Sequence, residues 1–166
     1  MATHRIPIIT QNCLPESGVF FDRVGNQITS ANPVGNQLAL VISDGGADRG
    51  FYDSFKIPKN YVGTPKIVVT GILDGAMTTV TLAFGARGIT VADNEVADAA
   101  YSTEDLGNTA VDHADEDKVE VSITLTNLTG FAVDDEVHYH LFINADVNTY
   151  AGNLLVTQVE FEYVDA

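Results

Sequence analysis

Apolar and polar residues alternate strictly along residues 118–126 of this chain. Val119, Val121, Ile123 and Leu125 occupy every second position, and charged or hydroxyl residues fill the positions between them. Successive side chains of a β-strand point to opposite faces of its sheet, so this spacing places the four apolar residues on one face. The segment is predicted to be a strand with one face in the core and the other in water.

Two segments nearer the C-terminus show the same period of two. The residues predicted to face the core are Val137, Tyr139, Leu141 and Ile143 in 136–144, and Leu155, Val159, Phe161 and Tyr163 in 154–164. The last third of the chain therefore contains three predicted strands.

Two apolar segments in the middle of the chain, 67–73 and 77–84, are separated by Asp74-Gly75. This pair of residues tolerates the positive φ angles of a type I′ turn. The two segments are therefore predicted to form a β-hairpin.

Residues 37–43 and 51–57 are also predicted strands, ended by Asp44-Gly45-Gly46 and by Pro58. No segment keeps apolar residues at helical spacing over three turns, so helices are expected to be absent or short. The chain is therefore predicted to be all-β. Its fold is expected to be a two-sheet β-sandwich, with a jelly roll as the preferred topology.

Residues 1–36 fall outside the strand pattern because prolines, asparagines and glycines interrupt brief apolar pieces. They are predicted to form an extended N-terminal arm that packs on the body or on a neighbouring subunit. Residues 37–166 are then the β-sandwich domain, and the length of 166 residues suits a single domain overall.

Residues 88–117 contain nine acidic residues and no Lys or Arg. The first part is predicted to extend the preceding strand through Ile89 and Val91. The remainder is expected to be a solvated loop, with one helical turn near residues 102–105 as an option.

Charge is divided unevenly along the chain. Residues 1–92 carry seven Lys/Arg and six Asp/Glu, whereas residues 93–166 carry one Lys and seventeen Asp/Glu, giving +1 and −16. We expect one nearly neutral surface for close contact and one anionic surface that repels nucleic acid. A nucleic-acid partner is excluded because the eight basic residues are dispersed in an anionic chain.

The sequence contains few groups suited to chemistry. His138, His140 and Glu136 lie on one face of a predicted strand and form a weak candidate metal site, but a polar row facing solvent or a subunit is the favoured interpretation. The acidic residues Asp112, Asp115, Glu116 and Asp117 lack the spacing of a calcium loop, and a charged surface loop is favoured. No metal or other cofactor is therefore expected.

Enzymatic and membrane functions find no support in the motifs. Cys13, the only cysteine, lies in the predicted arm, and nucleotide-binding, nucleophile-elbow and zinc-protease motifs are absent. A hydrolase built from paired carboxylates stays a minor alternative, because any two acids can meet in space. No apolar run approaches the roughly 18 residues of a membrane span, and no secretory signal is visible, so a soluble protein made in the cytosol is expected.

Residues 54–67, SFKIPKNYVGTPKI, and the segment 134–163 carry a family resemblance. The chain resembles small structural proteins of tailed bacteriophages in these motifs and in their order along the sequence. It departs from them in lacking an Arg near Asn144 and a Trp before the acidic loop.

The resemblance implies a virion protein, and a capsid decoration (cement) protein in particular. Such proteins are β-sandwiches, often homotrimers, that bind the major capsid protein lattice. The expected location is the capsid exterior, after synthesis in the host cytoplasm. The residues expected to contact the shell are Arg5, Phe20, Phe21, Arg23, Phe51, Tyr52, Lys56 and Lys59, with core filling as the alternative role of the aromatic ones.

The alternative function is a receptor-binding or carbohydrate-binding β-sandwich module of a tail or fibre. The absence of Trp weighs against carbohydrate binding, although Tyr is a possible substitute. In this alternative, Tyr101, His138 and His140 are the candidate ligand-binding residues.

Overall fold

The structure is a computed structural model that describes residues 1–9, 13–23, 37–43, 46–74, 77–93, 95, 99–113 and 118–165. The strands are β1 (Thr3–Pro7), β2 (Leu14–Pro15), β3 (Val19–Arg23), β4 (Leu38–Ile42), β5 (Arg49–Lys56), β6 (Tyr61–Leu73), β7 (Met77–Val91), β8 (Asp105–His113), β9 (Lys118–Thr124), β10 (Glu136–Ile143) and β11 (Leu154–Asp165). The described residues include no helix, so the all-β prediction is confirmed.

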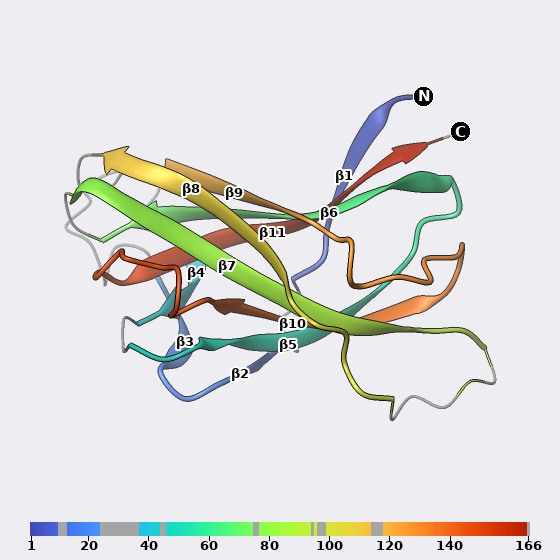
Figure 1. The fold of residues 1–166 in the computed structure, drawn as a ribbon, viewed down its shortest axis with the longest axis horizontal. Helices are drawn as coiled ribbons and strands as arrows, with labels where there is room; N and C mark the ends of the chain where they lie inside the picture. The colour runs from blue at the N-terminus through green and yellow to red at the C-terminus, as the bar shows by residue number, and fades with distance from the viewer. Residues whose placement is uncertain are drawn as a thin grey trace.

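The strands form two antiparallel sheets packed face to face (Figure 1). One sheet has the order β3-β4-β11-β6-β9, with β1 also pairing with β11, and the other has the order β2-β5-β10-β7-β8. Pairing is nested along the chain, because β4 pairs with β11, β5 with β10, β6 with β9 and β7 with β8. This is a long antiparallel ribbon wound into a jelly-roll sandwich, as predicted.

The predicted Asp74-Gly75 hairpin is wrong, although both of its strands exist. β6 belongs to one sheet, where it pairs with β9 and β11, and β7 belongs to the other, where it pairs with β8 and β10. Asp-Gly suits a tight turn between paired strands, but it does not determine the sheet that the next strand joins. In the nested ribbon, this connection crosses between the two sheets.

The core lies between the sheets and follows the alternation of the sequence. β9 alternates buried and exposed residues along its whole length, and the four residues predicted to face inward in β10 are all buried. In β11 one prediction fails: Leu155 is buried with Ala39 and Ile72, away from the main core, which takes Leu154 and Val156 instead. A register irregularity after Val156 shifts the alternation by one position, so Val159 and Phe161 face the core as predicted.

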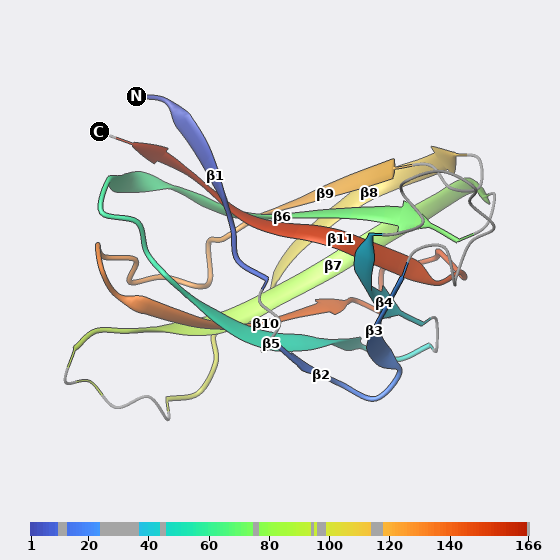
Figure 2. The ribbon, with the colours of Figure 1, turned by 180° about the vertical axis from the view of Figure 1, so that it is seen from behind.

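The N-terminal segment is not a free arm in its described parts. β1 pairs with β11, β2 with β5 and β3 with β4, so the segment contributes to both sheets. Ile8 is buried, and Tyr139 donates a hydrogen bond of 3.1 Å to its carbonyl oxygen. Figure 2 shows β1 beside the end of β11, with the two termini adjacent. The described residues of this segment pack on the β-sandwich of their own chain, which is one of the two predicted alternatives. The predicted boundary of the arm at residue 36 lies outside the described residues.

The acidic segment 88–117 contains more strand than predicted. β7 continues through Ile89 to Val91, as expected. Asp105–His113 is strand β8, where a solvated loop was expected, and no helical turn occurs at residues 102–105. Asp112 is exposed on β8, whereas residues 114–117, which hold the rest of the acidic cluster, lie outside the described residues.

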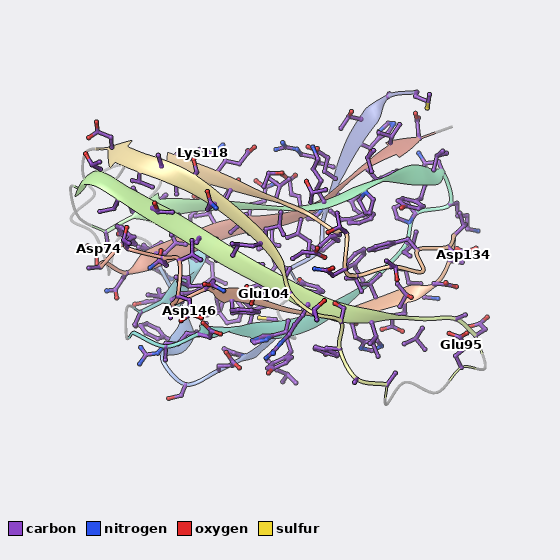
Figure 3. All side chains as sticks on the ribbon, in the orientation of Figure 1. Asp74, Glu95, Glu104, Lys118, Asp134 and Asp146 are labelled. Carbon is purple, nitrogen blue, oxygen red and sulfur yellow. The ribbon has the colours of Figure 1, made fainter. Side chains whose placement is uncertain are left out.

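The charge division along the chain does not become a division between two faces, which corrects the expected two-sided surface. Strands from the acidic half, β10 and β11, lie between strands from the nearly neutral half in both sheets. Acidic residues stand at both ends of the molecule, with Asp74 and Asp146 at one end and Glu95 and Asp134 at the other (Figure 3). Ion pairs also join the two halves of the sequence.

Candidate functional site

A row of side chains crosses the outer face of the second sheet at the middle of β10. Tyr52 on β5, His140 on β10 and Arg87 on β7 are direct cross-strand partners. Their neighbours Phe51 and Leu141 point into the core, so strand alternation turns the three side chains of the row outward.

Aromatic stacking orders this row. The Tyr52 and His140 rings lie 4.1 Å apart between centroids, with an interplanar angle of 9°. The other neighbour of His140 is Phe142, at 4.8 Å and 28°. The Arg87 guanidinium carbon lies 5.4 Å from the centre of the Phe142 ring. His140 is only 2% exposed, although it stands on an outer face.

Polar contacts fix the two rings in place. Arg87 Nε donates to His140 Nδ1 at 3.2 Å, which leaves the ring proton of neutral His140 on Nε2. Glu16 Oε2 lies 3.2 Å from Nε2, but no described residue accepts a hydrogen bond of good geometry from Nε2–H. Glu16 also accepts hydrogen bonds from the Tyr52 hydroxyl at 3.2 Å and from the Gly50 amide at 2.8 Å.

The surroundings keep His140 neutral. Burial is the largest influence and lowers its pKa, since removing an imidazolium from water is costly. The carboxylates of Glu16 and Asp48 oppose this effect, whereas Arg87 adds to it. The net result is a pKa below the ordinary value for histidine.

An open groove lies beside the row and has Tyr52 as one wall. Its volume is about 400 Å³, and its lining residues are Leu14, Tyr52, Asp53, Ser54, Tyr101 and His138. The Tyr101 and Tyr52 rings lie 6.3 Å apart at 47°, so they form two walls of a V rather than a flat platform. Burial, followed by proximity to Tyr52, raises the pKa of Tyr101, while Arg87 opposes the rise. We call this feature the tyrosine groove.

The sequence-based ligand candidates divide between the groove and its support. Tyr101 and His138 line the groove, whereas His140 lies beneath Tyr52 and is shielded from solvent. His140 thus lies on the outer face opposite the core residues, as expected, but neighbouring side chains cover it, so it does not face solvent. His138 Nε2 lies 3.6 Å from Glu136 Oε1. Within the described ranges, no three His, Cys, Asp or Glu residues gather closely enough to hold a metal ion.

Six of the eight predicted shell-contact residues are exposed, and two, Phe51 and Tyr52, are not. Phe51 is fully buried in the core, so its assignment to an interface is wrong. Phe20 and Phe21 on β3 are 42% and 37% exposed. The remaining exposed candidates are Arg23, Lys56, Lys59 and the ion-paired Arg5. Tyr52 is half-buried and belongs to the tyrosine groove.

Reasoning from the sequence missed Leu14, Asp53 and Ser54 of the groove lining, and Arg87 and Glu16 beside it. Arg87 alternates outward on a predicted strand, and this alternation was the available signal. Leu14 and Glu16 reach the site only because β2 pairs with β5, which no local pattern reveals.

Cys13 is not activated as a nucleophile. It is buried, and burial together with the nearby Asp53 raises its pKa to about 11. A thiol with such a pKa is almost entirely protonated near neutral pH.

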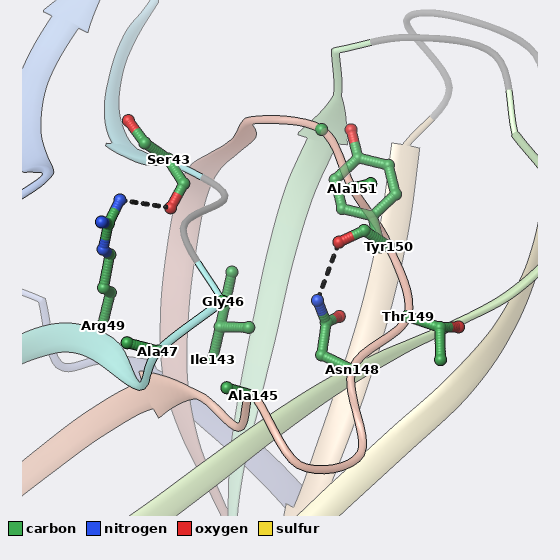
Figure 4. Close-up of a pocket in the computed structure, with 11 residues that line it drawn as sticks. Ser43, Gly46, Ala47, Arg49, Ile143, Ala145, Asn148, Thr149, Tyr150 and Ala151 are labelled. Carbon is green, nitrogen blue, oxygen red and sulfur yellow. Dashed lines mark hydrogen bonds between the residues drawn. The ribbon is translucent and has the colours of Figure 1, made fainter.

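A second hollow of about 150 Å³ lies at one end of the sandwich, between the β4–β5 and β10–β11 connections (Figure 4). Small residues such as Ala47 and Ala145 line much of it. Polar groups on its walls bond within the chain: Arg49 Nη1 donates to the Ser43 carbonyl at 3.3 Å, and Asn148 Nδ2 donates to the Tyr150 carbonyl at 2.8 Å. The tyrosine groove, with its larger volume and its aromatic walls, is the stronger candidate site.

No protein-family model matches the chain, and no curated protein shows significant similarity to it. Solved structures do share its fold. The CBM22-2 xylan-binding domain of Paenibacillus barcinonensis Xyn10C superposes with a TM-score of 0.50 at 8% identity, covering 97% of this chain and 99% of that one. The CBM22-1-GH10 modules of Clostridium thermocellum xylanase 10B, complexed with xylohexaose, give 0.51 at 9% identity. That match covers 98% of this chain and 28% of the other.

At these identities, the likeness shows the fold alone, a β-sandwich of jelly-roll type. No helix among the described residues is long and apolar enough to cross a membrane.

Proposed function

We propose that this protein is a non-catalytic carbohydrate-binding module whose ligand lies in the tyrosine groove. The observation that carries the proposal is the pair of tyrosine rings, Tyr52 and Tyr101, that line an open groove with His138. Carbohydrates present apolar C–H faces, which pack on aromatic rings, and hydroxyl groups, which need polar partners. The groove provides both kinds of contact on a rigid sheet.

The charge of the groove favours a neutral glycan. Asp53 is the one carboxylate in the lining, and neither Lys nor Arg lines the described groove. The whole chain carries a net charge of −15, so an anionic sugar approaches against repulsion. The xylan-binding domain with the same fold supports xylohexaose as the first probe.

Binding to a glycan array, followed by calorimetry with xylohexaose and with the strongest array ligand, tests the proposal. Tyr101→Ala is expected to weaken binding about tenfold or more, equivalent to about 1.4 kcal/mol, because it removes one wall of the V. Phe20→Ala, which removes an exposed aromatic ring from another strand, is the matched control and is expected to bind normally. A flat array profile, or unchanged binding by Tyr101→Ala, contradicts the proposal.

A second candidate is a structural protein of the virion that decorates the capsid, as the resemblance to tailed-phage proteins implies. The exposure of Phe21 and Arg23, which lie on the same side of strand β3, supports it, because an apolar side chain next to a basic one suits contact with another protein. Phe20 is exposed on the opposite side of the strand. The partners are then the capsid lattice and further copies of this chain in a trimer, at the capsid exterior.

Cosedimentation with undecorated phage shells tests this candidate. Saturable binding that is lost in the double variant Phe20→Ser/Phe21→Ser is the expected result. Finding the protein only in tail fractions defeats the decoration role and leaves a glycan-binding module of a tail or fibre.

A further inference from the structure

We propose that His140 positions Tyr52 for glycan binding, and that protonation of His140 in mild acid releases Tyr52 and weakens binding. This inference rests on the proposed function of the tyrosine groove. It assigns His140 a positioning role, because its buried ring contacts Tyr52 without lining the groove.

One wall of the groove is the Tyr52 ring, and the ring of His140 packs against it almost parallel at 4.1 Å. The Tyr52 hydroxyl donates a hydrogen bond to the Glu16 carboxylate, which also accepts one from the Gly50 amide. The orientation of Tyr52 therefore depends on the position of His140 and on the hydrogen bonds of Glu16.

Protonation of His140 removes its hydrogen bond with Arg87. In the neutral ring, Nδ1 is an acceptor and receives Arg87 Nε–H at 3.2 Å. Adding a proton to Nδ1 turns this atom into a donor, so two N–H groups then oppose each other and the hydrogen bond is lost. The new imidazolium also lies beside the Arg87 guanidinium, with which it shares its sign of charge.

Charged groups from three other parts of the chain surround His140. The groups near His140 are Arg87 from β7, Glu16 from the β2–β3 connection, Asp48 from the β4–β5 connection and the stacked ring of Tyr52 from β5. Arg87 opposes protonation, whereas Glu16 and Asp48 favour it. An imidazolium draws Glu16 Oε2 toward Nε2 and so turns the carboxylate whose Oε1 accepts the Tyr52 hydroxyl. Protonation thus moves the His140 ring away from Arg87 and weakens the hydrogen bond that orients Tyr52.

An NMR titration of the ligand-free protein tests this coupling directly. The Tyr52 ring resonances and the His140 Cε1–H resonance are expected to move with one common midpoint in acid. The variant Arg87→Gln removes the guanidinium and is expected to raise that midpoint. Tyr52 resonances that stay constant while His140 titrates overturn the proposal, as does an unchanged midpoint in Arg87→Gln.

A binding titration with xylohexaose tests the consequence. The wild-type protein is expected to bind at least about twofold more weakly near pH 5 than near pH 7.5, because lower pH favours the imidazolium. The variant His140→Phe retains a ring under Tyr52 but cannot be protonated, so its affinity is expected to vary little with pH. Its melting temperature verifies folding at both pH values.

Two histidine variants locate the effect. His4→Gln, far from the groove at the chain termini, is expected to retain the acid dependence. The variant His138→Gln is also expected to retain the acid dependence, whatever its affinity for xylohexaose. If the acid dependence is lost in His138→Gln, the pH-sensitive group is His138 and the proposal is overturned. Absence of xylohexaose binding at every pH counts against this ligand for the proposed function, whereas the ligand-free titration still decides the role of His140.

Discussion

At the residue scale, Asp105 shows how one buried carboxylate organises a connection. Asp105 is only 3% exposed. Its carboxylate accepts hydrogen bonds from the Thr126 hydroxyl at 2.7 Å and from the backbone amides of Asn127 and Leu128 at 2.9 and 3.1 Å. Burial acts to raise the pKa of Asp105, but these hydrogen bonds outweigh burial and hold the pKa below its usual value. The carboxylate therefore fixes the turn after β9 to the start of β8.

The variant Asp105→Asn is expected to lower the free energy of unfolding by about 1–3 kcal/mol, because its amide group faces donors that it cannot satisfy. Asp112→Asn, on the exposed face of the same strand, is the control and is expected to change stability little. Urea denaturation at neutral pH measures both. Equal losses in the two variants contradict the role of Asp105.

The depressed pKa of Asp105 also predicts a pH dependence. In the unfolded chain the carboxyl titrates near its ordinary value of 3.8, and in the folded protein it titrates lower. Its stabilising effect is therefore fully present above pH 3.8 and is lost as pH falls through the folded value. The stability difference between wild type and Asp105→Asn is expected to narrow in acid, and a difference that stays constant there contradicts this assignment.

Thr64 on β6 is a second informative residue. Its φ of 52° lies in the left-handed region, which β-branched residues rarely adopt. Asn tolerates this region better, so Thr64→Asn is expected to raise stability by about 0.5–1 kcal/mol. The same change at Thr124, exposed on the regular strand β9, is expected to lower stability slightly, and thermal unfolding of both variants measures the difference. A lower melting temperature of Thr64→Asn than of the wild type contradicts the claim that the backbone at Thr64 is strained.

At the element scale, β1 is held on the sheet by charges as well as by pairing. Arg5 donates to Glu162 at 2.7 Å and to Glu120 at 3.0 Å, and it lies 3.8 Å from Glu160. Burial acts to raise the pKa of Glu162, but the Arg5 and Lys66 hydrogen bonds outweigh it and hold the pKa low. Arg5 is 37% exposed at its side chain, so water screens these pairs.

The variant Arg5→Gln is therefore expected to cost less than about 1 kcal/mol of global stability. Its local effect is larger, because β1 amides are expected to exchange with deuterium faster while those of β10 stay protected. Lys59→Gln, an exposed cation outside β1, is the control. Unchanged exchange in β1 contradicts the ionic attachment.

Strands were predictable from the sequence where one face of the strand is buried and the other is exposed to solvent. β9 and the core face of β10 satisfy this condition, and their alternation identified them. β8 escaped prediction because its polar residues and Gly107 resemble a loop, although strand pairing with β7 satisfies their backbone groups. Leu155 was misplaced because a register irregularity reverses the alternation, and no local pattern marks its position.

At the whole-molecule scale, the nested ribbon explains both the success and the limits of prediction for the site. Tyr101 and His138 were recognisable as candidates from residue type alone. Their meeting with Tyr52 and Leu14 depends on which strands become neighbours, and this is a property of the wound chain. The same winding mixes the acidic and the nearly neutral halves, so the charge division along the sequence gives no reliable guide to the surface. The homotrimer stays a prediction.

Glycan binding in the tyrosine groove can be located by mapping NMR chemical shifts of the protein with the strongest glycan from the array. The backbone and side-chain signals of Tyr52, Tyr101 and His138 are expected to move on binding, whereas those of the hollow near Thr149 and of the β3 edge at Phe20 are expected to stay in place. Shifts that cluster at either of those two places, with the tyrosine groove unaffected, contradict this binding site.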